Sequence, residues 1–165
     1  MSICQSQARG DWVDEIVDRY ADMVYRIAFT QTKNQADADD IFQEVFLKLC
    51  KSAVSFETDE HIKAWLIRVT INASRKFFGS GWNKKTVAFP EDLVYEEKDQ
   101  YTEIIPIVQS LPSKYRTVIH LFYFEDMPIA EIAKILNLKA TTIKSQLSRG
   151  RGIIKNKLKG GFENV

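Results

Sequence analysis

Apolar residues in the first half of the chain recur three or four positions apart, the spacing that places side chains on one face of an α-helix. This spacing predicts three amphipathic helices, at about residues 11–33, around 38–49 and at 59–79, with residues 1–10 as a preceding tail. The inward-facing positions predicted for the three helices are Val13, Ile16, Val17, Tyr20, Val24, Ile27 and Ala28, then Ala38, Ile41, Phe42, Val45 and Leu49, then Ile62, Leu66, Val69, Ala73 and Phe77.

The second predicted helix also has a polar strip opposite its apolar stripe. Asp40, Gln43, Glu44 and Leu47 stand at i, i+3, i+4 and i+7, so they share one face of the helix. Taken alone, such a strip is typical of a solvated helix face.

Helical periodicity stops near Gly79 and resumes after residue 100. The intervening stretch contains two glycines, one proline and many acidic side chains, which is typical of a linker. Beyond it, one short helix is predicted before Pro112 and another after it, because proline is tolerated in the first turn of a helix.

These patterns predict an all-α protein with two small helical domains. A three-helix bundle occupies residues 11–79, a flexible acidic linker residues 80–100, and a second helical domain residues 101–165.

A short helix, a turn and a longer helix are predicted near the C-terminus. The short helix has Pro128 at its first turn and ends at Asn137, a residue that tolerates left-handed backbone. The longer helix has two opposite faces, at about 100° of rotation per residue. Its apolar stripe is Ile143, Leu147, Ile154 and Leu158, and its other half holds Thr141, Lys144, Ser145, Ser148, Arg149 and Lys155. This spacing is that of a helix-turn-helix, whose second helix enters the major groove of DNA.

The basic face of the longer helix has the side chains that a major-groove helix needs, namely groups that reach base edges and cations that neutralise phosphates. We expect the base contacts from Lys139, Thr141, Thr142, Lys144 and Ser145, with Ser148 on the same face and Arg149 and Arg151 nearer the phosphates. Gly150 and Gly152 each cost a helix interior about 1 kcal/mol relative to alanine, so we expect a bend or fraying there.

Composition excludes several classes of protein. The chain has 165 residues, of which 45% are hydrophobic and 27% charged, as in a globular protein. No run approaches the roughly 18 apolar residues of a membrane span, and the N-terminus lacks a signal peptide, so we expect a cytoplasmic protein. Cysteines and histidines lack metal-ligand spacing, and no nucleophile–base set or glycine-rich phosphate loop appears. We therefore expect neither an enzyme nor a bound cofactor or metal.

The formal net charge of +1 hides a strong segregation of charge along the chain. Residues 11–60 hold 12 acidic and 5 basic side chains, whereas residues 61–90 hold 6 basic and no acidic ones. Residues 86–103 are again acidic, and residues 139–165 hold 7 basic side chains and 1 acidic one. Two basic segments indicate two contacts with a polyanion, and the acidic segments indicate a different kind of partner.

Several short segments are similar to those of one protein family. In the second half these are LPSKYR at 111–116, IAEIAKIL at 129–136 and TIKSQLSRGR at 142–151. They resemble region four of the extracytoplasmic-function sigma factors. In the first half, DADDIFQEVF at 37–46 and KAWLIRVTIN at 63–72 resemble that family's region two, so the likeness runs in the family's order.

The resemblance implies a non-catalytic subunit that joins core RNA polymerase and directs it to promoters. At the matching positions, Asp39, Asp40, Gln43, Glu44 and Phe46 would contact the clamp region of the polymerase. The C-terminal helix-turn-helix would bind the minus-thirty-five element.

The resemblance also implies that the loop at residues 52–59 and the third helix melt and read the minus-ten element, with one base extruded into the loop. The residues expected to bind it are Phe56, Arg68, Asn72, Arg75, Lys76, Trp82, Lys84 and Lys85, of which Phe56 and Trp82 would stack on bases. Trp65 flanks the apolar stripe and is assigned to the core.

Regulation is also implied by the family alone. It suggests control by an anti-sigma factor, which can be membrane-anchored, and target genes of a stress or envelope response. The acidic linker resembles the family's connector between regions two and four, which passes near the RNA path. Two alternatives stay open from the sequence: a helix-turn-helix regulator that binds operator DNA without polymerase, and a helical protein-interaction adaptor.

Overall fold

The computed structural model describes residues 3–79 and 104–163, and it divides the chain into two compact units, residues 1–85 and 86–165. Within the described ranges the chain is helical and contains no strand, as the sequence predicts. The predicted acidic linker at residues 80–100 lies outside the described residues.

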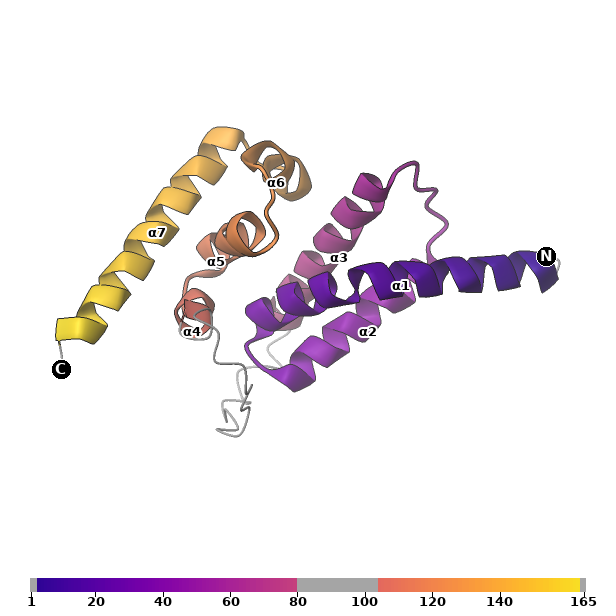
Figure 1. Cartoon of the computed structure of the whole chain (residues 1–165), viewed down its shortest axis with the longest axis horizontal. Helices are drawn as coiled ribbons and strands as arrows, with labels where there is room; N and C mark the ends of the chain where they lie inside the picture. The colour runs from indigo at the N-terminus through magenta and orange to yellow at the C-terminus, as the bar shows by residue number, and fades with distance from the viewer. Residues whose placement is uncertain (1–2, 80–103, 164–165) are drawn as a thin grey trace. The chain divides into compact units, whose positions relative to one another are not determined.

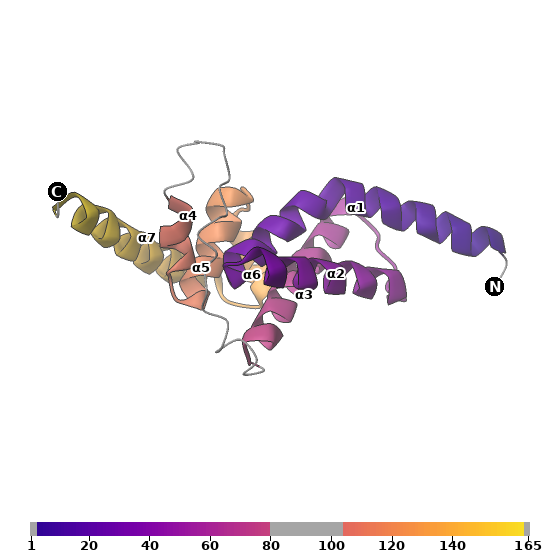
Figure 2. The same ribbon diagram turned by 90° about the horizontal axis from the view of Figure 1, so that it is seen from below.

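The first unit is a bundle of three helices, α1 (Ile3–Thr32), α2 (Gln35–Lys51) and α3 (Asp59–Gly79). Each helix packs against the other two (Figures 1 and 2). Asn34 starts α2, because its side chain accepts a hydrogen bond from the backbone N–H of Asp37 at 2.8 Å. Each helix supplies fully buried aliphatic side chains to the shared core, which includes Val24, Ile27, Ile41, Leu49, Leu66 and Ile67.

Two details of this bundle differ from the sequence prediction. The first helix begins at Ile3 rather than at residue 11, so residues 3–10 are helical where a tail was predicted. Those residues include polar helix formers that add no apolar period, so the periodicity did not mark them. In α3, Ile67 and Ile71 are buried while Val69 and Phe77 are only half-buried, because α3 packs on two neighbours and its buried face is wider than one stripe.

The second unit consists of α4 (Ile104–Gln109), α5 (Ser113–Ile119) with a π-helical turn η2 (His120–Phe124), α6 (Ile129–Leu136) and α7 (Ala140–Glu163). Buried side chains from all of these segments meet in one core, among them Val108, Val118, Leu121, Ile132, Ile143 and Leu147.

Two buried polar groups fix the turns of this unit. The Arg116 guanidinium donates hydrogen bonds to the backbone carbonyls of Gln109 and Leu111, at 3.1 and 3.3 Å, and so joins the end of α4 to α5. Burial lowers the pKa of Arg116. Nε2 of His120 lies 3.2 Å from the Glu125 carboxylate, and both side chains are 4% exposed, so this pair closes the π-helical turn.

The helix-turn-helix forms as the sequence predicts. Asn137 ends α6 with a φ of 54°, in the left-handed region, and α7 begins at Ala140. The N–H of Leu138 then bonds to the carbonyl of Ala133 at 3.0 Å, which closes the end of α6.

Gly150 and Gly152 behave differently from expectation, because α7 continues through both of them to Glu163. Gly150 is buried where α7 crosses α5, and a Cβ atom there would stand 3.0 Å from Cγ1 of Ile119 and 3.5 Å from Cβ of Tyr115. Nothing lies within 4 Å of the corresponding position at Gly152. Gly150 is therefore a close-packing position rather than a point of bending.

Candidate nucleic-acid and protein interfaces

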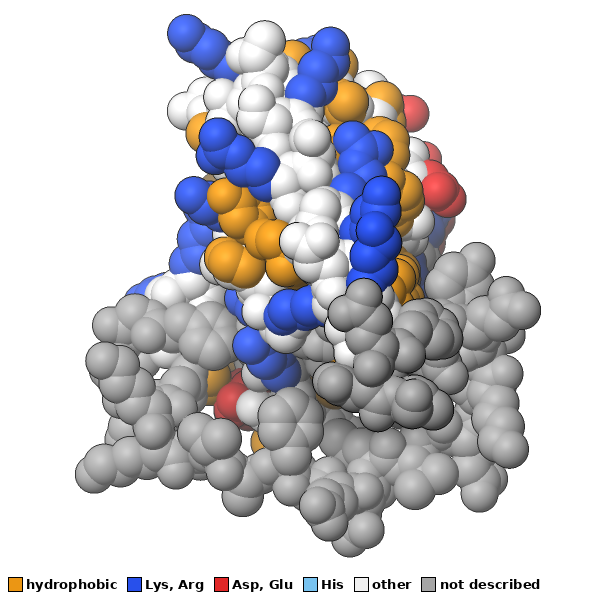
Figure 3. Space-filling view, turned by 90° about the vertical axis from the view of Figure 1, so that its left-hand side faces the viewer, with side chains coloured by type: hydrophobic (Ala, Val, Ile, Leu, Met, Phe, Trp, Pro, Cys, Tyr) orange, Lys and Arg blue, Asp and Glu red, His pale blue; other side chains and the backbone are white. Residues whose placement is uncertain are grey.

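The reading face of α7 follows from its two-sided pattern. Ile143 and Leu147 are buried against the core, which turns the opposite side of the helix outward. The predicted DNA-binding residues on that side are exposed, except Thr142, which is half-buried; the exposed ones are Lys139, Thr141, Lys144, Ser145, Ser148 and Arg149. Arg151 is also exposed, but it lies beside the buried stripe, about 40° around the helix from Leu147. In Figure 3 the charged side chains over α7 are mainly Lys and Arg.

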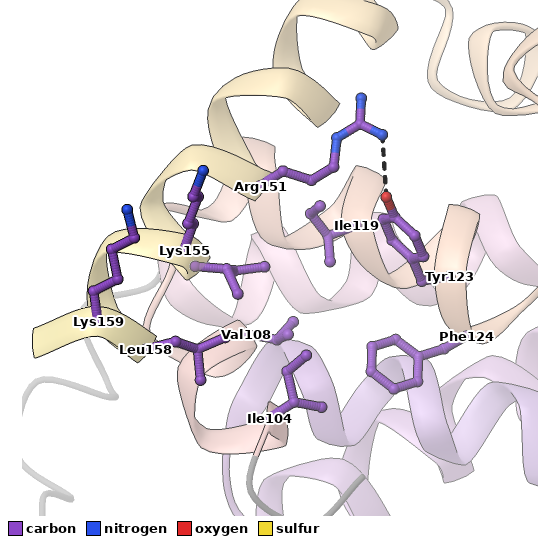
Figure 4. Close-up of a pocket in the computed structure, with 10 residues that line it drawn as sticks. Ile104, Val108, Ile119, Tyr123, Phe124, Arg151, Lys155, Leu158 and Lys159 are labelled. Atoms are coloured by element: carbon purple, nitrogen blue, oxygen red, sulfur yellow. Dashed lines mark hydrogen bonds between the residues drawn. The ribbon is translucent and has the colours of Figure 1, made fainter. Parts of the chain in front are cut away.

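Two arginines of α7 are oriented by tyrosines. A hydrogen bond with Arg149 lowers the pKa of Tyr115, and the Arg151 guanidinium donates a hydrogen bond to the Tyr123 hydroxyl at 3.1 Å (Figure 4). Both partners are phenols rather than carboxylates, so neither contact neutralises a guanidinium. Each arginine therefore keeps its charge, which a phosphate can neutralise.

The C-terminal half of α7 borders an apolar groove of about 580 Å³ within the second unit (Figure 4). Its floor and walls come from α4, α5, η2 and α7, through Ile104, Val108, Ile119, Tyr123, Phe124, Ile154 and Leu158. Arg151, Lys155 and Lys159 add cations along the side formed by α7. A groove of this kind suits an apolar protein segment with acidic flanks.

The sequence did not predict this groove. It assigned Leu158 to the buried stripe of the last helix, but the side chain is 40% exposed and lines the groove. Of the other apolar residues that line it, the sequence assigned Ile119 and Ile154 to core stripes and made no assignment for Ile104, Val108, Tyr123 and Phe124. The one available signal in the sequence was that the apolar stripe continues as far as Leu158, between two lysines near the C-terminus.

The polar strip of α2 lies on the surface of the first unit. Asp39, Asp40 and Gln43 are exposed, and Glu44 is half-buried beside Lys48, with the carboxylate 3.2 Å from the ammonium. Leu47, next on the strip, is 56% exposed. Exposed carboxylates and an exposed leucine therefore share one surface of α2.

Phe46 does not belong to this strip. It is 7% exposed, and its ring packs against that of Phe42 with centroids 4.8 Å apart. The resemblance had put Phe46 among the polymerase contacts, but in the folded unit it is a core residue, and Leu47 is the apolar residue that reaches the surface.

A basic face runs along α3. Arg68, Asn72, Arg75 and Lys76 are exposed and fall within about 100° of one another around the helix. The opposite side is buried, so these four side chains form one surface track. Trp82, Lys84 and Lys85, predicted to extend the track, lie outside the described residues.

The loop between α2 and α3 brings aromatic residues together beside this track. Phe56 is half-buried, and its ring stacks on Trp12 of α1 with centroids 5.9 Å apart. It also meets His61 and Trp65 of α3 edge-on, at 5.2 and 5.6 Å. Trp65 is half-buried, at the border of the core to which the sequence assigned it.

None of the helices within residues 3–79 and 104–163 is both long and apolar enough to cross a membrane. No three His, Cys, Asp or Glu side chains come together there as a possible metal site.

Comparison with protein families gives two matches in the order of the two units. Residues 16–83 match the model of sigma-70 region 2, and residues 102–153 match that of sigma-70 region 4. The two matches contain the strip of α2, the track of α3 and all the predicted DNA-binding residues from Lys139 to Arg151.

Individual relatives are similar over most of their length. The RNA polymerase sigma factor SigV of Bacillus subtilis is 31% identical, over 81% of this chain and 83% of the relative. The ECF RNA polymerase sigma factor SigW of the same organism is 29% identical, over 88% of each chain. The ECF RNA polymerase sigma-E factor of Escherichia coli is 27% identical, over 74% of each.

Solved structures show the same fold. CnrH, solved in complex with the cytosolic domain of CnrY, superposes with a TM-score of 0.73 at 19% identity, over 94% of this chain and 92% of CnrH. The sigma factor RpoE of Bartonella quintana, solved with the anti-sigma factor NepR, gives 0.71 at 20% identity, over 88% of this chain and 96% of RpoE.

Proposed function

The chain belongs to the extracytoplasmic-function group of the sigma-70 family, and from this premise we propose how its surfaces work. It is a sigma factor, which binds core RNA polymerase and directs it to specific promoters. The observation that carries the proposal is the separation of an acidic strip on α2 from two basic surfaces on α3 and α7. One surface suits a protein partner, and the other two suit DNA.

The strip of α2 is the contact with core polymerase, at the clamp region. Asp39, Asp40, Gln43 and Glu44 supply polar and charged groups, and Leu47 supplies an apolar side chain at the end of the strip. Charged groups around an apolar residue give both electrostatic steering and a buried contact.

The reading face of α7 is the contact with duplex DNA at the minus-thirty-five element. Hydroxyls and Lys144 lie in the first turns, where a recognition helix reaches base edges, and Arg149 and Arg151 follow, nearer the phosphates. The two tyrosine-held guanidinium groups support this division, because a fixed cation positions the helix on the backbone.

The track of α3 and the loop before it are the contact with the minus-ten element. Arg68, Asn72, Arg75 and Lys76 follow the phosphates of the separated strand, and the loop, with Phe56 at its centre, receives the extruded base. Trp82, Lys84 and Lys85 remain predictions for the same strand.

We further propose that an anti-sigma factor controls the chain. The part of this partner that binds the chain would be an apolar segment flanked by acidic residues. The groove beside α7 fits such a segment, because its walls are apolar and its one charged side is basic. The structurally similar RpoE was solved in complex with an anti-sigma factor, NepR. A stress or envelope-response regulon fits this mode of control.

We also propose that the chain acts in the cytoplasm, where the polymerase is. It would catalyse no reaction itself, since the polymerase forms the phosphodiester bonds. The same proposal leaves it without a cofactor.

Reconstituted transcription tests the proposal. Purified chain is mixed with core polymerase and a library of genomic promoter fragments, and transcript starts are mapped. We expect a small set of starts with a shared upstream sequence, absent when the chain is omitted. A competent core that gives no selective transcript contradicts the proposal, and tight operator binding without polymerase would favour a conventional regulator.

A further inference from the structure

The loop at residues 52–58 is tied to α1, a helix that lies far from it in sequence (Figure 1). At the start of the loop, the Arg9 guanidinium donates a hydrogen bond to the backbone carbonyl of Ser52. At its centre, the rings of Trp12 and Phe56 stack, with 23° between their planes.

The end of the loop is held by the same helix. Arg19 donates a hydrogen bond to the Asp59 carboxylate at 2.9 Å, and the Tyr20 hydroxyl donates to the Asp59 backbone carbonyl at 3.3 Å. The Asp59 carboxylate also raises the pKa of Arg19. Arg9, Trp12, Arg19 and Tyr20 fall within about 100° of one another around α1, so one face of the helix holds the whole loop.

This face is separate from the packing that folds the bundle. Arg19 and Asp59 have side chains that are 42% and 67% exposed, and Trp12 is half-buried. The exposed Arg19–Asp59 ion pair adds little to global stability, and the Trp12–Phe56 ring pair adds about 0.5–1.5 kcal/mol. Their effect is to restrict the loop, which is otherwise free to sample many backbone conformations.

The surroundings of Phe56 indicate how the loop is restricted. Trp12 covers one side of its ring, while His61 and Trp65 approach it edge-on. A ring with these neighbours is already in contact with protein where a base would stack. Phe56 therefore fits the part of an anchor for the loop better than that of a stacking platform.

We propose that Arg9, Trp12 and Arg19 are positioning residues for reading of the minus-ten element, and that they act by holding loop 52–58 on α1 through Phe56 and the loop ends. The inference rests on the proposed function, because it needs this loop to receive a promoter base. A loop fixed before DNA arrives loses less entropy on binding, so it binds the correct strand more tightly and tolerates a wrong base less well.

The test uses holoenzyme formed with core polymerase and two fluorescent single-stranded oligonucleotides. One carries the minus-ten sequence of a promoter that the wild-type holoenzyme transcribes, and the other carries the same bases scrambled. The quantity measured is the ratio of the two dissociation constants. The variants are Trp12→Ala and Trp12→Phe, with Asp14→Ala as the matched control on the opposite, exposed side of α1.

We expect Trp12→Ala to reduce this ratio by about 3- to 10-fold, the range that the loss of one aromatic pair produces. Trp12→Phe, which keeps a stacking ring, and Asp14→Ala should retain the wild-type ratio. Affinity for core polymerase should stay at its wild-type value in all three variants, while the melting temperature should fall by about 8 °C or less in Trp12→Ala and stay at its wild-type value in the other two. A second pair, Arg19→Ala against Asp18→Ala, should show a smaller loss for Arg19→Ala alone.

Failure of the positioning role and failure of the proposed function give different results. A wild-type ratio in Trp12→Ala, or a fall in core affinity and melting temperature that parallels the fall in ratio, overturns the positioning role. A wild-type holoenzyme that transcribes selectively but shows no preference for its own oligonucleotide also overturns it. Failure of the wild-type chain to direct any transcription overturns the proposed function instead.

Discussion

The two surfaces that we assign to DNA bases are held in place in different ways. The reading face of α7 is fixed from behind, by buried aliphatic side chains and by the close approach of Gly150 to Ile119. Loop 52–58 is fixed from the side, by surface contacts with a helix some 40 positions earlier in the chain, such as Arg19 with Asp59. The recognition helix thus contributes side chains to a hydrophobic core, whereas the loop is held on the outside of its unit by surface contacts.

This difference separates stability from function in the two units. Weakening the support of α7 should unfold the second unit, because its reading face and its core share one helix. Weakening the support of the loop should leave the first unit folded and change only how it reads DNA. The contrast suits their proposed tasks, since a duplex can be read by a rigid helix, while an extruded base must enter a loop that has room to receive it.

The largest effect should come from truncating the buried support of α7. Leu147→Ala should lower the free energy of unfolding by about 2–5 kcal/mol, because it removes a fully buried side chain and leaves a cavity. Ser148→Ala, its exposed neighbour, should change stability by less than about 0.5 kcal/mol. Urea unfolding followed by far-ultraviolet circular dichroism measures both.

Tryptophan fluorescence distinguishes the two units in the same experiment. All three tryptophans, Trp12, Trp65 and Trp82, lie in residues 1–85, the first unit. In Leu147→Ala the fluorescence transition should therefore stay at its wild-type midpoint while part of the dichroism is lost earlier. Equal shifts of both signals would contradict the separate support of the two surfaces.

The next effect concerns the close approach at Gly150. Gly150→Leu should destabilise the second unit by about 1–3 kcal/mol, since even a Cβ atom there meets Ile119 at 3.0 Å. Gly152→Leu is the matched control, because its surroundings are open, and it should stabilise the helix by about 0.5–1 kcal/mol. The same unfolding experiment measures both, and equal effects of the two substitutions would show that Gly150 is not a packing position.

The strip of α2 provides a change that should affect neither DNA surface. Replacing Gln43 and Glu44 together with lysine should weaken binding to core polymerase by about tenfold or more, because it reverses charge on an exposed strip. Fluorescence anisotropy with labelled chain measures this. Asp14→Lys with Asp18→Lys is the control, since it adds at least as much positive charge to exposed positions of α1. A similar loss in the control would assign the effect to net charge.

The smallest effect should appear in the salt dependence of duplex binding. Arg149→Ala should weaken binding of the minus-thirty-five duplex modestly and lower the slope of log affinity against log salt by about one, because it removes an exposed cation that we place near the phosphates. Arg75→Ala, on the α3 track, should leave that slope unchanged and weaken binding of the minus-ten single strand. Titrations at several salt concentrations compare the two, and an interchange of these effects would reverse our assignment of the surfaces.

The sequence predicts the reading face of α7 better than it predicts the support of loop 52–58. The reason is that the first depends on local spacing, whereas the second depends on contacts between residues far apart in the chain. The reading face of α7 follows from the local spacing of apolar residues. That spacing alone predicts that Ile143 faces the core and that Lys144 faces outward. The support of the loop depends on Trp12 meeting Phe56, and no local pattern specifies a contact between residues so far apart.

The sequence prediction is wrong where a helix packs against more than one neighbour, or where it extends beyond the helices that it packs against. Ile67 and Ile71 are buried because α3 packs on two helices, and a single predicted stripe did not include them. Leu158 continues the stripe of α7 past the end of the core, so it lines an open groove instead. Phe46 sits one position before the exposed Leu47, and only the packed bundle decides which of the two faces outward.

The central claim, that one chain grips a promoter with two separate surfaces, can be tested by tethered DNA cleavage. A cleavage reagent is attached to Val54→Cys in the loop or to Ser148→Cys on α7, both exposed, in a chain with Cys4→Ser and Cys50→Ser. Holoenzyme is then bound to a promoter that it transcribes, and the cut positions are mapped. We predict cuts around the minus-ten element from residue 54 and around the minus-thirty-five element from residue 148, more than one helical turn apart. Overlapping cuts from the two positions, or the same cuts on DNA without the promoter, would contradict the account.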